Sequence, residues 1–269
     1  MKMLVAALLA AAATPAIAAD PATVEITRLD CGSGLVKDFN AFFSDTLEYP
    51  AGPRTVTSSC YLIRHMDHYL LWDTGFAAAL KGAPATQGAF APSLRVTVAE
   101  QLATLGVKPT DITVVGISHM HADHTGQAAA FPAAKLIVGK ADFEGTKGPK
   151  DPLGPWRAKG AKVQTMHGGD IDVFGDGSVI ALNLPGHTPD HMALLVKLAS
   201  GNVLLSGDLY HAHEARELKG VPPFNTSRAE TLASMDRFER LAKRYNAKVI
   251  IQHEPRDIAK LPAFPKSAQ

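Results

Sequence analysis

Apolar residues along the chain gather in short runs separated by polar turns and glycine-rich loops. Short apolar runs flanked by turn residues are typical of strands in a buried sheet. We therefore expect strands at 24–29, 58–63, 69–72, 112–117, 135–138, 162–165, 179–184, 192–197, 203–205 and 248–251. The strands 58–63 and 69–72 form a predicted hairpin around the polar turn 64–68.

Two segments show helical spacing instead. The segment 94–105 is amphipathic and stops at Gly106, and the segment 231–244 places apolar residues three and four positions apart. We expect loops at 82–92, 145–155 and 206–225. Grouped strands with interspersed helices, and no repeat of fixed length, predict a layered α/β sandwich.

The first nineteen residues differ from the rest of the chain. Lys2 gives a positive start, 4–9 is apolar, and 16–19 offers small residues for cleavage. We interpret 1–19 as a cleaved signal peptide and 20–269 as a single domain, which predicts a periplasmic or secreted protein. A membrane anchor is the alternative, but the apolar run ends too early to span a bilayer.

Composition and charge narrow the class of partner. The 269 residues include 27 Lys and Arg against 26 Asp and Glu. The charges are nearly balanced, so there is no basic surplus of the kind that indicates nucleic-acid binding. The mature chain also has no polybasic segment that would attach it to a membrane. We expect a small-molecule substrate, and the sequence is compatible with a homodimer.

Two cysteines, Cys31 and Cys60, remain after cleavage. An oxidising compartment permits one disulfide between them, and two buried free thiols are the alternative. Neither belongs to a CxxC pair, so cysteine-based metal binding is not expected.

The segment 119–124, with the sequence HMHADH, follows the buried strand 112–117. In an extended segment His119 and His121 point to the same side and can bind one ion. If a helix starts at Asp123, then Asp123 and His124 diverge and can serve a second ion. Such donors without thiolate favour zinc, although iron, manganese or cobalt can use them too.

Three further candidates follow buried strands in the predicted loops. They are His187, Asp208 and His253. Ligands in layered α/β folds gather at such strand ends, so these residues would complete two coordination shells. His65, His68 and His167 lie outside any such pattern, and we expect them to be surface or core residues.

In this order, the seven candidate ligands resemble the HxHxDH, His, Asp and His pattern of the metallo-β-lactamase superfamily. The resemblance runs from about Cys60 to His253 and implies a four-layer αβ/βα sandwich with two divalent ions at one edge. It implies that His119, His121 and His187 bind one ion, that Asp123, His124 and His253 bind the other, and that Asp208 bridges both.

Within the superfamily, the segments 60–62, 73–75, 118–126 and 185–191 most resemble the N-acyl-homoserine lactonases, which act in quorum quenching. True metallo-β-lactamases carry Cys or Ser in place of Asp208. The resemblance also implies that Asp73 orients an imidazole. Lactonases place a tyrosine three residues after the bridging aspartate; here that position is His211 and Tyr210 precedes it, so either could contact the substrate carbonyl.

We therefore expect an exported hydrolase that opens N-acyl-homoserine lactones or related lactones by attack of a hydroxide held between two metals. Asp123 would relay a proton to the leaving oxygen. The alternatives are a phosphotriesterase or arylesterase, then a β-lactamase, then a periplasmic metal-binding protein without turnover. The acyl chain would meet aromatic side chains drawn from Phe42, Phe43, Phe76, Phe90 and Trp156, each of which is otherwise a core residue.

Overall fold

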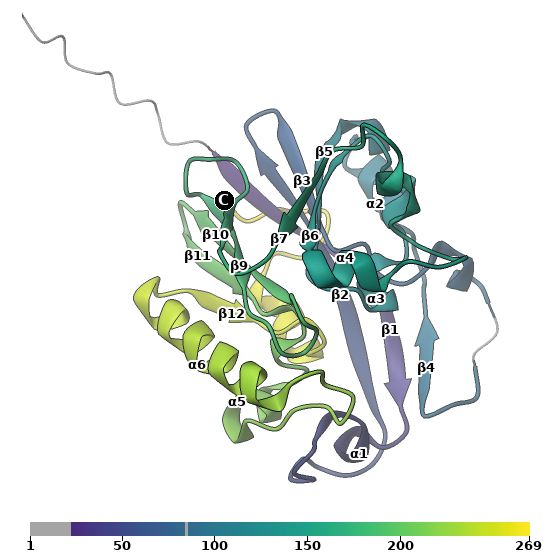
Figure 1. Ribbon diagram of the computed structural model, residues 1–269, viewed down its shortest axis with the longest axis vertical. Coiled ribbons are helices and arrows are strands. Elements are labelled where there is room, and N and C mark those ends of the chain that lie inside the picture. Colours follow the sequence, from purple (N-terminus) through teal and green to yellow (C-terminus); the bar gives the residue numbers. More distant parts are fainter. Residues whose placement is uncertain (1–22, 84–85) are drawn as a thin grey trace, which may run out of the picture.

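A computed structural model describes residues 23–83 and 86–269 of the chain. Its two sheets face each other, and helices cover the outer face of each sheet (Figure 1). The fold is thus the expected four-layer α/β sandwich. The predicted signal peptide, residues 1–19, lies outside the described residues.

The larger sheet has seven strands in the order β4-β1-β2-β3-β5-β6-β7. Strands β4, β1, β2 and β3 pair antiparallel, and β3, β5, β6 and β7 pair parallel. Its strands are β1 (Val24–Val36), β2 (Arg54–His65), β3 (His68–Trp72), β4 (Phe90–Ser93), β5 (Ile112–Ile117), β6 (Lys135–Gly139) and β7 (Val163–Met166).

The smaller sheet has five strands in the order β12-β11-β10-β9-β8. Strands β8, β9, β10 and β11 pair antiparallel, whereas β12 pairs parallel with β11. Its strands are β8 (Ile171–Asp172), β9 (Val179–Asn183), β10 (Met192–Leu198), β11 (Gly201–Leu205) and β12 (Lys248–Ile250).

Helix α2 packs on the outer face of the seven-stranded sheet, and α6 packs on the outer face of the five-stranded sheet (Figure 1). Helix α6 presents Met235 and Phe238 to the sheet, as its helical spacing predicts. The helices are α1 (Phe39–Phe43), α2 (Val98–Thr104), α3 (Ala122–Thr125), α4 (Lys140–Gly145), α5 (His213–Leu218) and α6 (Arg228–Arg244).

The core between the two sheets is built from alternate side chains of facing strands. Trp72 and Ile137 of one sheet and Leu194 and Leu205 of the other are at most 1% exposed. Burial of this apolar surface fixes the two sheets against each other, which in turn fixes the loops at their shared edge.

Three helices and strands differ from the expected ones, where a local cap or a tertiary contact outweighs the apolar pattern. The predicted helix 94–105 begins only at Val98, because Thr97 and Glu100 form a capping box at its start. Strand β4 begins within the predicted loop 82–92, extends one residue beyond it and pairs with β1. Helix α5 lies inside the predicted loop 206–225.

A disulfide joins Cys31 of β1 to Cys60 of β2, with 5.7 Å between the Cα atoms. Both side chains are buried among the residues under α2. Of the two alternatives that the sequence leaves open, the structure therefore has the disulfide.

Within the described residues, no helix combines the length and apolar character that crossing a membrane requires.

Candidate metal centre

The two sheets bring the candidate ligands to one edge of the sandwich. Strand β9 runs parallel to β11 because both pair antiparallel with β10, and β12 is parallel to β11. His187, Asp208 and His253 follow the carboxyl ends of these strands, so all three lie at the same edge. His119 follows β5 of the facing sheet.

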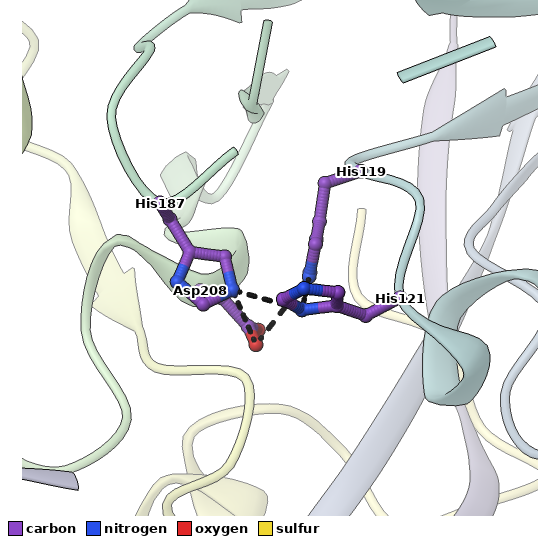
Figure 2. Close-up of side chains that lie close together, drawn as sticks. All are labelled: His119, His121, His187 and Asp208. Atoms are coloured by element: carbon purple, nitrogen blue, oxygen red, sulfur yellow. Dashed lines mark hydrogen bonds and ion pairs between the residues drawn. The ribbon is translucent and has the colours of Figure 1, made fainter. Parts of the chain in front are cut away.

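The first group of donors consists of His119, His121, His187 and Asp208, drawn together in Figure 2. Nδ1 of His121 lies 2.9 Å from Nε2 of His119 and 3.1 Å from Nε2 of His187. Oδ2 of Asp208 lies 3.6 Å from Nε2 of His119 and of His187. These four donor atoms lie within 4.8 Å of one another, close enough to surround one ion.

The second group consists of Asp123, His124 and His253. Oδ2 of Asp123 lies 3.7 Å from Nε2 of His124 and 3.5 Å from Nε2 of His253. Oδ1 of Asp208 lies 3.2 Å and 3.0 Å from the same two nitrogens. Oδ2 of Asp208 also lies 3.1 Å from Nε2 of His253, so the carboxylate contacts both groups, as a bridging ligand would.

Hydrogen bonds on the far side of three of the rings direct their ligand nitrogens inward. Nδ1 of His253 donates to the carbonyl oxygen of Thr57 at 2.7 Å, and Nδ1 of His187 lies 3.0 Å from Oδ1 of Asn225. Nδ1 of His124 donates to Asp73 at 2.9 Å. A neutral ring that donates through Nδ1 carries a lone pair on Nε2, which is the form a metal ligand needs.

Where two such acceptors face each other, a cation between them would make the arrangement favourable. Nε2 of His124 and Oδ1 of Asp208 lie 3.2 Å apart, are both buried and have no hydrogen-bond partner among the described residues. Buried polar atoms without a partner are rare because they lose their hydration. The residues present therefore fit a divalent ion at each group, since metal coordination would satisfy both atoms.

The charge of the centre also favours a cation. Burial holds the pKa of His119 and of His187 well below the ordinary value, so both rings are neutral. Burial also lowers the pKa of His124, but the carboxylates of Asp208, Asp123 and Asp73 together outweigh it and raise that pKa well above the ordinary value. The carboxylates therefore give this half of the centre a negative potential.

Asp73 and His191 support the ligands from behind. Asp73 follows β3, the parallel neighbour of β5, and accepts hydrogen bonds from the backbone nitrogen and the hydroxyl of Ser118 as well as from His124. Nε2 of His191 accepts from the backbone nitrogen of Asp208 at 2.9 Å. A Cβ at Gly207 would lie 2.6 Å from that Nε2, so only glycine permits this contact.

The structure separates the two candidates for contact with the substrate carbonyl. Nε2 of His211 lies 3.1 Å from Oδ2 of Asp208, and the ring stacks on His253 at 5.4 Å between centroids. The hydroxyl of Tyr210 instead donates to Glu239 at 3.0 Å on the other side of the chain. Adjacent side chains of an extended segment point apart. Tyr210, one of the two residues expected to contact the carbonyl, therefore lies outside the centre and packs in the core under α6.

A cavity of about 300 Å³ opens beside the donors. Phe42, Phe43 and Phe90 line it as expected, whereas Phe76 and Trp156 are buried elsewhere. Phe224, which no pattern in the sequence singled out, is 47% exposed and also lines the cavity. The complete lining is Phe42, Phe43, Val56, Phe90, His121, Ala122, Asp123, Asp208, His211, Phe224 and His253.

The three histidines that were expected to lie outside the metal pattern do so. His65 is buried and pairs with Asp176 at 2.7 Å, while His68 is exposed on β3. The side chain of His167 is 75% exposed.

The chain is similar to known proteins in sequence and in fold. The family model of the metallo-beta-lactamase superfamily matches residues 53–253. The chain is 32% identical over 166 residues to the N-acyl homoserine lactonase AttM of Rhizobium radiobacter. The matched segment covers 58% of this chain and 63% of that relative. The chain therefore spans 63% of the length of the first relatives that it matches.

Two further comparisons extend over more of the chain. An N-acyl homoserine lactonase AttM of Rhizobium johnstonii is 31% identical over 212 residues, which is 72% of this chain and 81% of that relative. The crystal structure of a quorum-quenching N-acyl homoserine lactone hydrolase superposes with a TM-score of 0.76 at 22% identity, covering 91% of this chain and 98% of that one. The superposition shows that the two proteins share the fold.

Proposed function

Because the chain belongs to the metallo-beta-lactamase superfamily, we propose that it is an exported, dinuclear metal hydrolase that opens N-acyl-homoserine lactones or related lactones. The observation that carries the proposal is the position of Asp208. Its two carboxylate oxygens contact both groups of donors, beside a cavity that four phenylalanines help to line.

The donors of this chain would form two sets of ligands, one for each ion. His119, His121 and His187 hold one ion, Asp123, His124 and His253 hold the other, and Asp208 is shared. Nitrogen and oxygen donors without thiolate favour zinc over softer metals, and iron, manganese or cobalt can use the same set. When bound, such ions supply a nucleophilic water at neutral pH and a Lewis acid for the carbonyl oxygen.

Asp123 is the carboxylate placed to move the proton. Its side chain is 19% exposed and lines the cavity, whereas the side chain of Asp208 is 4% exposed. In the proposed reaction Asp123 takes the proton that the attacking water loses and passes it to the ring oxygen as the ester bond breaks. The products are the ring-opened alcohol and a carboxylic acid, which releases its proton to the solvent at neutral pH. One proton of the water thus ends on the alcohol and the other in solution.

His211 is the residue placed to bind the carbonyl. Its ring lies in the cavity lining between Phe43, at 4.5 Å between centroids, and His253. If its Nε2, which lies 3.1 Å from Asp208, turned to the carbonyl oxygen, the imidazole N–H would stabilise the negative charge that develops there. In this assignment His211 replaces the tyrosine of the lactonases that the chain resembles.

The apolar side of the cavity supports a substrate with a hydrocarbon chain. Phe42, Phe90 and Phe224 lie around the mouth, with Phe42 5.8 Å from Phe90 and 5.5 Å from Phe224 between ring centroids. Aromatic walls beside a small set of polar groups are typical of sites for amphipathic small molecules. An acyl chain would pack along these rings while the lactone faces the donors.

Export is the second part of the proposal. The disulfide between Cys31 and Cys60 supports it, because disulfides persist in the periplasm and outside the cell and are rare in a reducing cytosol. The apolar segment at the start of the sequence has the pattern of a signal peptide.

A panel of substrates tests the proposed reaction. The purified protein would be assayed with N-acyl-homoserine lactones, a simple lactone, an aryl phosphotriester and a cephalosporin. We expect the highest kcat/KM on a lactone and a loss above roughly 100-fold in His121→Ala, because loss of a ligand should exceed the about 10- to 100-fold cost of losing a partner behind a ligand. His68→Ala, which changes an exposed histidine on β3, is the matched control and should retain full activity. A preference for the phosphotriester or the cephalosporin would refute the lactonase assignment.

A further inference from the structure

Two neighbouring residues of the loop between α5 and α6 contact different parts of the centre. Asn225 lies behind the ligand His187, with Oδ1 3.0 Å from its Nδ1. Phe224 lies in front, with its ring centroid 6.0 Å from that of His187 and 6.1 Å from that of His121. One short stretch of chain thus contacts both the metal ligand and the mouth of the cavity.

The contacts of Asn225 fix the orientation of its amide. Nδ2 lies 3.1 Å from the carbonyl oxygen of Gly186, 3.3 Å from that of Ser227 and 2.6 Å from Oγ1 of Thr231. Two of these partners are carbonyl oxygens, which only accept, and the hydroxyl of Thr231 is already donating to Ser227. The amide group must therefore face these three atoms, and Oδ1 must face His187.

That orientation determines the form of the His187 ring. Because Oδ1 of Asn225 is only an acceptor, Nδ1 of His187 must carry the hydrogen of this bond. The lone pair then lies on Nε2, which points to the donor atoms of His121 and Asp208. A partner behind a ligating histidine typically changes metal affinity or activity by about 10- to 100-fold.

We propose that Asn225 is a positioning residue that sets the tautomer of His187 for metal binding and, through the same loop, holds Phe224 over the cavity to select apolar substrates. The metal half rests on the proposed dinuclear function. The side chain of Asn225 links the two roles. Its Oδ1 holds the ring of His187, and its amide hydrogens hold the segment that carries Phe224.

In variants of Asn225 the residues that follow it would stay in place, whereas Phe224, which precedes it, would be freed. The backbone nitrogen of Thr226 donates to the carbonyl oxygen of His187 at 3.1 Å, and that of Ser227 donates to Gly186 at 2.8 Å. Neither bond involves the Asn225 side chain, so its replacement leaves the loop attached and the protein folded. Asn225 is also only half-buried, which reduces the cost of a change in polarity.

Three variants separate the two roles. Asn225→Leu keeps the size of the side chain and removes both the acceptor and the amide hydrogens. Asn225→Asp keeps an oxygen for Nδ1 of His187 and loses the hydrogens that bind Gly186 and Ser227. Phe224→Ala leaves Asn225 intact and removes the ring over the cavity.

Metal release to a zinc-binding dye, measured without substrate, tests the first role. We expect Asn225→Leu to bind one of its two ions about 10- to 100-fold more weakly than the unsubstituted protein. The metal affinities of Asn225→Asp and Phe224→Ala should stay within about threefold of the unsubstituted protein. Equal retention in Asn225→Leu and the unsubstituted protein would overturn the assignment, as would equal loss in Asn225→Leu and Asn225→Asp.

Steady-state kinetics test the second role. Phe224→Ala and Asn225→Asp should raise KM for a long-chain lactone roughly 3- to 10-fold with little change in kcat, as expected for the loss of an aromatic contact, and should affect a short-chain lactone less. An unchanged ratio of long-chain to short-chain KM in Phe224→Ala would overturn the selectivity role. If the unsubstituted protein opened no lactone, the proposed function would fail, while the dye measurement would still decide the role of Asn225.

Discussion

Asp73 and His124 form a fully buried pair in which Oδ2 of the carboxylate lies 2.9 Å from Nδ1 of the ring. The two residues come from the ends of neighbouring parallel strands, β3 and β5, so the topology of the sheet brings them together. The pair turns Nε2 of His124 toward Asp123 and Asp208. A residue that binds no ion itself therefore determines how the second group of donors is presented.

Removal of the Asp73 carboxylate should weaken metal binding. In Asp73→Ala, we expect the affinity for one ion to fall about 10- to 100-fold, because Nδ1 of His124 loses its acceptor. Metal per chain after dialysis against a weak chelator measures this. Asp172→Ala, which removes a carboxylate that only binds the backbone of Gly175 and Gly177, is the control. Unchanged metal content in Asp73→Ala would contradict the role given to this pair.

The neighbours Tyr210 and His211 should respond differently to substitution. Tyr210→Phe should keep kcat and lower the free energy of unfolding by about 1 kcal/mol, because it removes one buried hydrogen bond to Glu239. His211→Phe should keep both ions and lower kcat roughly 100-fold through loss of the carbonyl donor. Kinetics with metal analysis and urea unfolding distinguish the two effects. A large loss of kcat in Tyr210→Phe, with His211→Phe active, would reverse the assignment.

The sequence predicts those features of the fold that depend on local pattern. Strand β5 has the expected bounds, because a six-residue apolar run ends abruptly at the polar segment that begins with Ser118. The seven candidate ligands meet at one edge because each follows a strand of matching direction. Local pattern fails for α1, a helix of five residues capped by Asp38, which is too short to show a period.

Asp73, which contacts His124, is the one support that the resemblance implied. The supports of His253 and His187 could not be predicted from the sequence, for a physical reason. His253 donates to the carbonyl oxygen of Thr57, 196 positions away, and every residue type has such an oxygen. Asn225 contacts His187 from 38 positions away, in a segment expected to be a loop. Neither contact has a spacing or residue pattern, so both depend on how the two sheets pack.

The disulfide should contribute measurably to stability. Cys31 and Cys60 are 29 positions apart, and closing a loop of that length stabilises the folded state by roughly 3–4 kcal/mol on the chain-entropy estimate. Urea unfolding should therefore show a lower midpoint for Cys31→Ala/Cys60→Ala than for the unsubstituted protein. Reductant should lower the midpoint of the unsubstituted protein and leave that of the double variant unchanged. Equal midpoints under all conditions would contradict this expectation.

Export predicts a processed N-terminus. When the full sequence is expressed in a Gram-negative bacterium, we expect the protein in the periplasmic fraction, with a mass that corresponds to a chain beginning at Asp20. Leu8→Arg/Leu9→Arg interrupts the apolar run and should leave the uncleaved chain in the cytoplasm. Recovery of the uncleaved, unsubstituted chain from the cytoplasm would contradict the proposed localisation.

Metal titration of the apoprotein tests the dinuclear lactonase most directly. The ions would be removed with a chelator, and zinc would be added back while lactone opening and thermal stability are followed. We predict that lactone opening rises until two equivalents of zinc per chain are bound, and that the melting temperature rises with it because the ions bind the folded state. Lactone opening by the metal-free protein, or saturation of zinc binding at one equivalent, would contradict the account.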